Sequence, residues 1–150
     1  VDEIKEKFES LLLQKMAVQK IGDPMKKSTK IGPLARRDLR DELHRQVVQS
    51  IEQGATCLLG GQIPEIHGNF YLPTVLTNVT KNTPAYYEEL FGPVAVIISA
   101  KDEKDAIRIA NDSVFGLGAA IFTSDVKKGE RLATEEIEVG CCFVNDFVRS

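Results

Sequence analysis

The sequence is poor in the residues that build disulfide frameworks, zinc sites and membrane spans. It contains no tryptophan, only 3 cysteines and 6 prolines in 150 residues. Cys57, Cys141 and Cys142 are odd in number and lack CxxC spacing, so we expect reduced thiols and no metal site. No apolar stretch approaches the roughly 18 residues of a membrane span, and no signal peptide opens the chain. These absences predict a cytoplasmic protein with no membrane partner.

The chain also lacks an excess of positive charge. Its 19 basic and 22 acidic residues give a net charge of -3, which argues against a nucleic-acid partner because duplex binding needs a basic surface. The composition, 43% hydrophobic and 27% charged, is typical of a globular domain. A domain of this size buries roughly 68–70% of its unfolded surface, so its core needs neither disulfides nor a metal.

The two ends lack the polar character of natural termini. The chain starts at Val1 without a methionine and stops at Ser150, directly after an apolar run. The length predicts one compact domain or a piece of a larger one. From the two ends we expect that the chain was cut from a longer protein.

Two amphipathic helices are predicted in the first third. Apolar residues recur at helical spacing over residues 2–19, and glycines and prolines fill the loop up to residue 33. Leu39, Leu43, Val47 and Ile51 then recur every four residues, and Gly54 ends this second helix.

The remainder predicts strands alternating with helices. Residues 55–59 and 71–79 are strand candidates, and Pro73 favours an edge position for the second. The series that follows reads strand, helix, strand, helix, strand, at residues 94–100, 102–110, 118–122, 126–137 and 139–144. This order predicts an α/β fold, a mostly parallel sheet with flanking helices. Ligands bind beyond the carboxyl ends of such strands, which indicates the loop before Val94 and residues 123–124 and 145–146.

The segment EELFGPV at residues 88–94 is the strongest local signal. A carboxylate there accepts hydrogen bonds, as from two ribose hydroxyls, and an aromatic ring offers a flat apolar face. An ordinary helix end followed by a core phenylalanine and a turn accounts for the same residues. Composition alone favours that second interpretation.

This segment resembles the EE-[IL]-FGPV motif of the NAD(P)-dependent aldehyde dehydrogenase superfamily, and five further segments follow the pattern of that family in order. They are IGDP and IGPL at residues 21–24 and 31–34, GA and GG at 54–55 and 60–61, GNFYLPTVL at 68–76, ANDSVFGL with AAIFTSD at 110–117 and 119–125, and GCCFVN at 140–145. The helix segment LARRDLRDEL at 34–43, with His44 and Gln46, resembles the bacterial succinate-semialdehyde dehydrogenases. A solvated charged face explains that helix equally well.

The resemblance implies a fold, a reaction and a set of contacts. The chain would be part of a catalytic domain that oxidises an aldehyde to an acid through a cysteine thioester, with NAD or NADP as cofactor. Glu89 matches the residue that binds the nicotinamide ribose, and Phe91 and Leu117 match residues beside the nicotinamide ring. Asn145 and Phe147 fall where the last strand opens into the loop that admits the aldehyde, although Asn145 also suits a turn residue bonded to backbone.

The resemblance also shows what the 150 residues lack. In the family, the nucleophilic cysteine and the general-base glutamate lie upstream of this region, as does the cofactor-binding sheet, and an oligomerisation strand lies downstream. Cys57, Cys141 and Cys142 match no nucleophile position, and His44 and His67 have no triad partners. We therefore expect no catalytic residue here, an inactive partial catalytic domain over residues 1–150, and those missing parts elsewhere.

Two functions remain open at this point. The first is an enzyme acting on a small-molecule aldehyde, succinic semialdehyde, with a homodimeric or homotetrameric parent. The alternative is a stand-alone, non-catalytic domain that serves as an interaction or scaffold module. Arg149 lies close enough to the aldehyde loop to approach a substrate carboxylate, but an exposed terminal arginine without that role explains it as well.

Overall fold

The computed structural model describes residues 1–149, apart from the side chain of Asp2. The chain divides into two compact units, Asp2–Ser99 and Ala100–Ser150, each of which has its own sheet.

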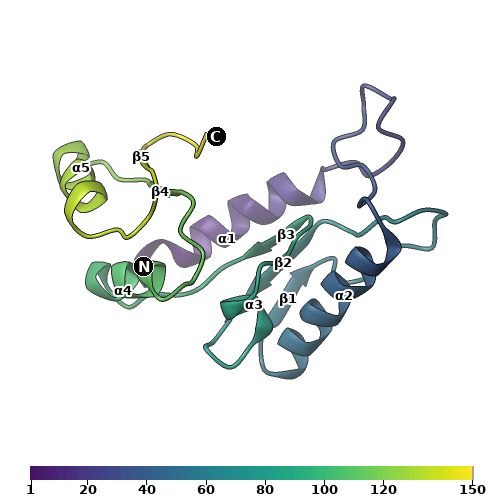
Figure 1. Ribbon diagram of the computed structural model, residues 1–150, viewed down its shortest axis with the longest axis horizontal. Helices are drawn as coiled ribbons and strands as arrows, with labels where there is room; N and C mark the ends of the chain where they lie inside the picture. Colours follow the sequence, from purple (N-terminus) through teal and green to yellow (C-terminus); the bar gives the residue numbers. More distant parts are fainter. Residues whose placement is uncertain (150) are drawn as a thin grey trace. The chain divides into compact units, whose positions relative to one another are not determined.

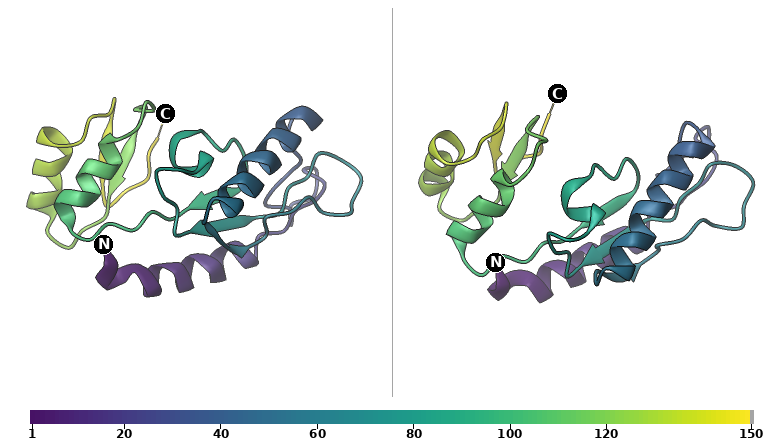
Figure 2. Two further views of the ribbon diagram at one scale, coloured as in Figure 1. Left: turned by 90° about the horizontal axis from the view of Figure 1, so that it is seen from below. Right: turned by 60° about the horizontal axis from the view of Figure 1, so that its bottom comes forward.

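The N-terminal unit is a three-stranded sheet with helices on both faces. Its elements are α1 (Asp2–Ala17), α2 (Arg37–Glu52), β1 (Thr56–Leu59), β2 (Thr74–Thr77), α3 (Pro84–Tyr87) and β3 (Val94–Val96). The strand order is β1-β2-β3, with β1 antiparallel and β3 parallel to β2. The two long helices α1 and α2 lie on opposite faces of this sheet (Figures 1 and 2). Both helices were predicted from their apolar spacing, and the structure confirms them.

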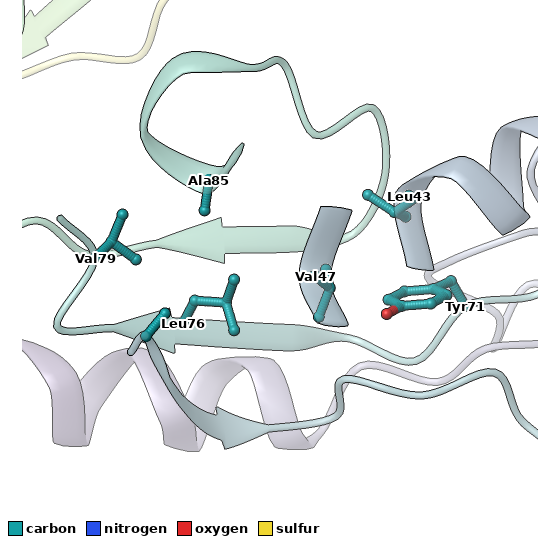
Figure 3. Close-up of a cluster of buried hydrophobic side chains, with 7 residues drawn as sticks. Leu43, Val47, Tyr71, Leu76, Val79 and Ala85 are labelled. Carbon is teal, nitrogen blue, oxygen red and sulfur yellow. The ribbon is translucent and has the colours of Figure 1, made fainter. Parts of the chain in front are cut away.

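The core of this unit lies between the sheet, α2 and α3. Leu43 and Val47 of α2 pack against Tyr71, Leu76, Val79 and Ala85, all of them buried, as Figure 3 shows. Leu76 faces this core, whereas its neighbour Thr77 donates a hydrogen bond to Glu9 of α1. This alternation along β2 lets one short strand contact both helix layers.

The expected edge position of the strand at residues 71–79 is wrong. The strand β2 is the central strand of its sheet, and all of its residues are buried. Pro73 precedes Thr74, the first strand residue, so its missing N–H removes no hydrogen bond from the ladder.

The strand predicted over residues 94–100 is shorter than expected. It pairs with β2 only as far as Val96, opposite Leu76, and Ile97 adds one further backbone bond to Leu76. The chain leaves β2 at Asn78, which has a φ of 55°. Because the partner strand turns away there, the apolar residues after Ile97 have no ladder to join.

The C-terminal unit is a parallel strand pair with two helices. Its elements are α4 (Glu103–Asn111), β4 (Ala119–Ile121), α5 (Val126–Glu135) and β5 (Cys142–Val144). Asp102 and Asp125 cap the two helices, and their carboxylates accept from the amides of Asp105 and Lys128. The strands β4 and β5 are hydrogen-bonded in parallel, and α5 connects them along the chain. This is the βαβ connection that the sequence predicted.

The single sheet implied by the strand series is not observed. Among the described residues, β3 pairs with β2, whereas β4 and β5 form a separate sheet. The α/β fold class is confirmed, with short parallel sheets and flanking helices.

Candidate functional site

The turn that joins α3 to β3 carries the Glu88–Glu89 pair and is tethered to α2. The Glu88 carboxylate accepts a hydrogen bond of 2.8 Å from Gln46 Nε2 and lies 3.5 Å from Arg45 Nη2. The backbone amide of Glu88 closes α3 on the carbonyl of Pro84 at 2.8 Å. Glu88 is thus engaged with protein through both its side chain and its backbone.

Glu89, by contrast, has a free carboxylate. The residue is exposed, and within residues 1–149 its side chain takes part in no hydrogen bond or ion pair. Only its backbone carbonyl is held, at 3.4 Å from Gln46 Nε2. An ionised carboxylate is a pure acceptor, so this group is available to the hydroxyl donors of a ligand.

Phe91 lies two residues further along the same turn and is 71% exposed. It lines an apolar pocket of about 240 Å³ together with Leu34, Ala35, Leu39 and Gly92. Sequence reasoning did not find Leu34, Ala35 and Leu39 as pocket residues. Leu39 belongs to the apolar stripe of α2, and only the fold shows that its end of the helix borders an opening rather than the core.

The turn with Glu89 and Phe91 precedes Val94, so it lies at the amino end of β3. The rule that places ligands at the carboxyl ends of parallel strands therefore does not describe this segment, contrary to expectation. It describes the C-terminal unit, where the loops after β4 and β5 lie side by side.

Asn145 joins those two loops. Its side-chain amide accepts from the Thr123 N–H at 2.8 Å and donates to the Thr123 carbonyl at 2.9 Å. Its backbone amide donates to Ile121, and its φ of 55° turns the chain out of β5. This geometry is that of a turn residue bonded to backbone, the second interpretation of Asn145 given above.

Leu117 and Phe147 are also in the C-terminal unit and are 83% and 75% exposed. Large apolar side chains with this exposure are available to a ligand. Arg149 pairs with the Asp146 carboxylate through contacts of 2.9 and 2.7 Å, so its guanidinium already has an anionic partner. The five predicted site residues thus divide between the units: Glu89 and Phe91 in one, and Leu117, Asn145 and Phe147 in the other.

The three cysteines are free and half-buried. Burial, and secondly the neighbouring Cys141, raises the pKa of the Cys142 thiol above its ordinary value, which disfavours the nucleophilic thiolate. Cys57 donates its S–H to the Leu59 carbonyl at 3.2 Å. His44 is bonded to the Tyr71 hydroxyl, and His67 is exposed in a turn.

Residues 1–149 contain neither a metal-binding cluster nor a helix that could span a membrane. No group of three or more His, Cys, Asp or Glu side chains in this range is arranged to hold a metal ion. None of the helices in the same range has both the length and the apolar character of a membrane span.

Comparisons with known proteins agree with the motifs. Succinate semialdehyde dehydrogenase Sad of Escherichia coli K12, named for NAD(P)+, is 49% identical over 134 residues, which are 89% of this chain and 29% of that protein. The NADP(+) succinate-semialdehyde dehydrogenase of Deinococcus radiodurans is 44% identical over 97% of this chain and 30% of that protein.

The fold agrees with solved structures of the same kind. Succinic semialdehyde dehydrogenase from Streptococcus pyogenes, solved with NADP+, matches with a TM-score of 0.94 and 35% identity over 99% of this chain and 32% of that chain. The chain thus spans about a third of the length of the proteins it matches. The sequence profile of the aldehyde dehydrogenase family matches residues 1–150, and the chain therefore belongs to the aldehyde dehydrogenase family.

Proposed function

We propose that residues 1–150 are part of the catalytic domain of an NAD(P)-dependent aldehyde dehydrogenase that oxidises succinic semialdehyde to the acid. The observation that carries this proposal is the free carboxylate of Glu89 on a turn whose Glu88 carboxylate and Glu89 carbonyl are both bonded to Gln46. The substrate assignment follows the names of the E. coli and D. radiodurans relatives.

The residues of the turn fit a nicotinamide nucleoside. Glu89 offers acceptor oxygens, which two ribose hydroxyls need, and it has no competing partner among the described residues. Phe91 offers a flat face beside an apolar pocket, which suits an aromatic ring. NAD(P)+ supplies the hydride acceptor of the oxidation when it is bound.

The C-terminal unit would contribute apolar surface. We assign Leu117 to the surroundings of the nicotinamide ring and Phe147 to the wall of the aldehyde pocket. Asn145 has its amide committed to Thr123, so it would act by fixing the loop that carries Phe147. A scaffold role for the chain would leave the exposure of Phe91 and the free Glu89 carboxylate unexplained.

The nucleophile of the reaction would come from sequence outside these 150 residues. Cys142 is disfavoured as a thiolate by burial, and the Cys57 thiol is bonded to the Leu59 carbonyl. The chain spans about a third of the length of these relatives. We expect the thioester-forming cysteine, the general base and the phosphate-binding sheet in other parts of such an enzyme. We further propose that the complete enzyme is a homodimer or homotetramer.

Glu89→Ala in the full-length dehydrogenase tests the proposal. A charge-assisted hydrogen bond contributes about 1.5–3 kcal/mol, so KM for NAD(P)+ should rise about 10- to 100-fold. The melting temperature should stay unchanged, because the carboxylate has no partner to lose among residues 1–149. Glu65→Ala, another exposed acid, is the matched control. An unchanged KM for NAD(P)+ in Glu89→Ala would contradict the assignment.

A further inference from the structure

A buried amide contacts the Glu88–Glu89 turn from the opposite element. Gln46 on α2 is only 7% exposed, and its Nε2 is the donor in both bonds described above, to the Glu88 carboxylate and to the Glu89 carbonyl. Both partners are acceptors without hydrogens to give. The side chain must therefore present its NH₂ group, and a carboxylate or an alkyl group at this position could not replace it.

The same face of α2 holds α3 one turn further on. The Ser50 hydroxyl accepts from the Ala85 amide at 3.0 Å while donating to the Gln46 carbonyl at 2.7 Å. Ser50 is fully buried. Two polar groups spaced four residues apart on α2 thus hold both ends of the segment that runs from α3 into the turn.

The Glu88 carboxylate is bonded mainly to Gln46, because Arg45 is engaged with other residues of α2. Arg45 forms two short bonds to Glu42, at 2.9 and 2.7 Å, and a third to Gln49 at 2.6 Å. Its contact with Glu88 is longer, at 3.5 Å, and lies at the surface. Surface ion pairs of this kind contribute little, whereas the part-buried bond that Gln46 donates to the same carboxylate is charge-assisted and shorter, at 2.8 Å.

We propose that Gln46 is a positioning residue for the cofactor: by holding the Glu88 carboxylate and the Glu89 carbonyl, it fixes the direction in which Glu89 presents its own carboxylate. Because the side-chain amide of Gln46 donates to the Glu88 carboxylate, the Glu89 carboxylate stays exposed and without a partner among residues 1–149. The identity of the ligand as the ribose of NAD(P) rests on the function proposed above, but the hold on the turn does not depend on it.

The hold on the turn is tested in the chain itself by hydrogen–deuterium exchange of residues 84–92. Gln46→Met keeps the length of the side chain and removes both donors, so exchange in this segment should accelerate about tenfold. Gln49→Met is the matched control, since Gln49 lies on the same helix and its side chain bonds to Arg45 and not to the turn. Exchange in Gln46→Met at the wild-type rate would overturn the proposal.

Exchanging the side chains of Gln46 and Glu88 tests whether their hydrogen bond, rather than packing alone, orders the turn. Gln46→Glu alone places two carboxylates against each other and should loosen the turn more than Gln46→Met does. The double variant Gln46→Glu, Glu88→Gln restores one hydrogen bond with donor and acceptor reversed. It should return exchange most of the way to wild type, and a double variant as loose as Gln46→Glu would contradict the pairing.

The consequence for the cofactor is read from steady-state kinetics of the full-length dehydrogenase. Gln46→Met should raise KM for NADP+ about three- to tenfold and change KM for succinic semialdehyde less than twofold. Faster exchange without any change in KM for NADP+ would overturn the positioning role. If Glu89→Ala also leaves that KM unchanged, the proposed function of Glu89 fails instead, while the exchange experiment still decides whether Gln46 holds the turn.

Discussion

Glu88 and Glu89 are adjacent and chemically identical, yet only the Glu88 carboxylate is bonded to other residues of the described chain. Gln46 and Arg45 face Glu88 from α2, so that carboxylate serves the structure. The Glu89 carboxylate has no hydrogen bond or ion pair among residues 1–149, and we propose that its oxygens accept from a ligand. The sequence motif alone could not separate the two, because the difference is made by Gln46, which lies 42 residues earlier in the chain. The resemblance to a family assigned Glu89, and the geometry supplies a physical reason for that assignment.

The buried Tyr71 should make the free energy of unfolding depend on pH. It is 0% exposed and its hydroxyl lies 3.2 Å from His44 Nδ1. Burial, and secondly Cys57, raises its pKa above the ordinary value, so the folded chain retains the phenol proton more tightly than the unfolded chain does. The stabilisation is fully present below the unfolded pKa of about 10 and is lost above it, by about 1.4 kcal/mol per pH unit.

Urea unfolding between pH 8 and pH 11 measures this effect. The wild-type free energy of unfolding should fall more steeply above pH 10 than that of Tyr71→Phe, which has no proton to lose. Tyr71→Phe should also be about 1 kcal/mol less stable near neutral pH, because it loses the hydrogen bond to His44. Parallel curves for the two proteins would rule out a role for the Tyr71 proton.

At the scale of elements, the helices were predictable and the strand pairing was not. Apolar spacing identified α1, α2, α4 and α5 because a helix is specified by its own residues. The central position of β2 depends on β1 and β3, and the end of β3 depends on where β2 turns at Asn78. The four-residue helix α3 is too short for a periodic pattern, and only the helix end in the second interpretation of residues 88–94 anticipated it, although Thr83 and Pro84 form a typical helix start.

Gly129 allows α5 to approach its sheet closely. A Cβ at this position would lie 2.8 Å from Thr123 Cγ2 and 2.9 Å from Val144 Cγ1, both on stiff β-branched side chains. Gly129→Ala gains up to about 1 kcal/mol of helix propensity but overpacks the interface by about 1–3 kcal/mol. We expect a net destabilisation of the C-terminal unit of about 1 kcal/mol.

The measurement is the exchange protection of β4 and β5 in Gly129→Ala. Protection should fall in both strands, with Glu130→Ala, an exposed neighbour in the same helix, as the control. An increase in protection would mean that helix propensity outweighs the close contact with Thr123 and Val144.

At the scale of the whole molecule, the family could be identified from the sequence. Motifs spread over residues 20–145 were sufficient to identify the family, and the profile match confirms it. The pocket formed by Leu34, Ala35, Leu39, Phe91 and Gly92 was not predictable, because its residues come from segments more than 50 positions apart. The roles of Leu117 and Phe147 stay predictions.

The purified 150-residue chain should show no dehydrogenase activity. Its three cysteines are half-buried, and the resemblance to the family implies that none of them is the nucleophile. Incubation with succinic semialdehyde and NAD+ or NADP+ should give no absorbance increase at the wavelength of the reduced cofactor. Cofactor reduction by a preparation free of host enzymes, and abolished by Cys141→Ala or Cys142→Ala, would contradict this expectation.

The proposed function depends most on the assignment of Glu89 to the cofactor. A crystal structure of the full-length dehydrogenase with NADP+ tests it most directly. We expect the Glu89 carboxylate at hydrogen-bonding distance, about 2.6–3.2 Å, from the hydroxyls of the nicotinamide ribose, with Glu88 still bonded to Gln46. Ribose hydroxyls bonded to other residues, with the Glu89 carboxylate left in solvent, would contradict it.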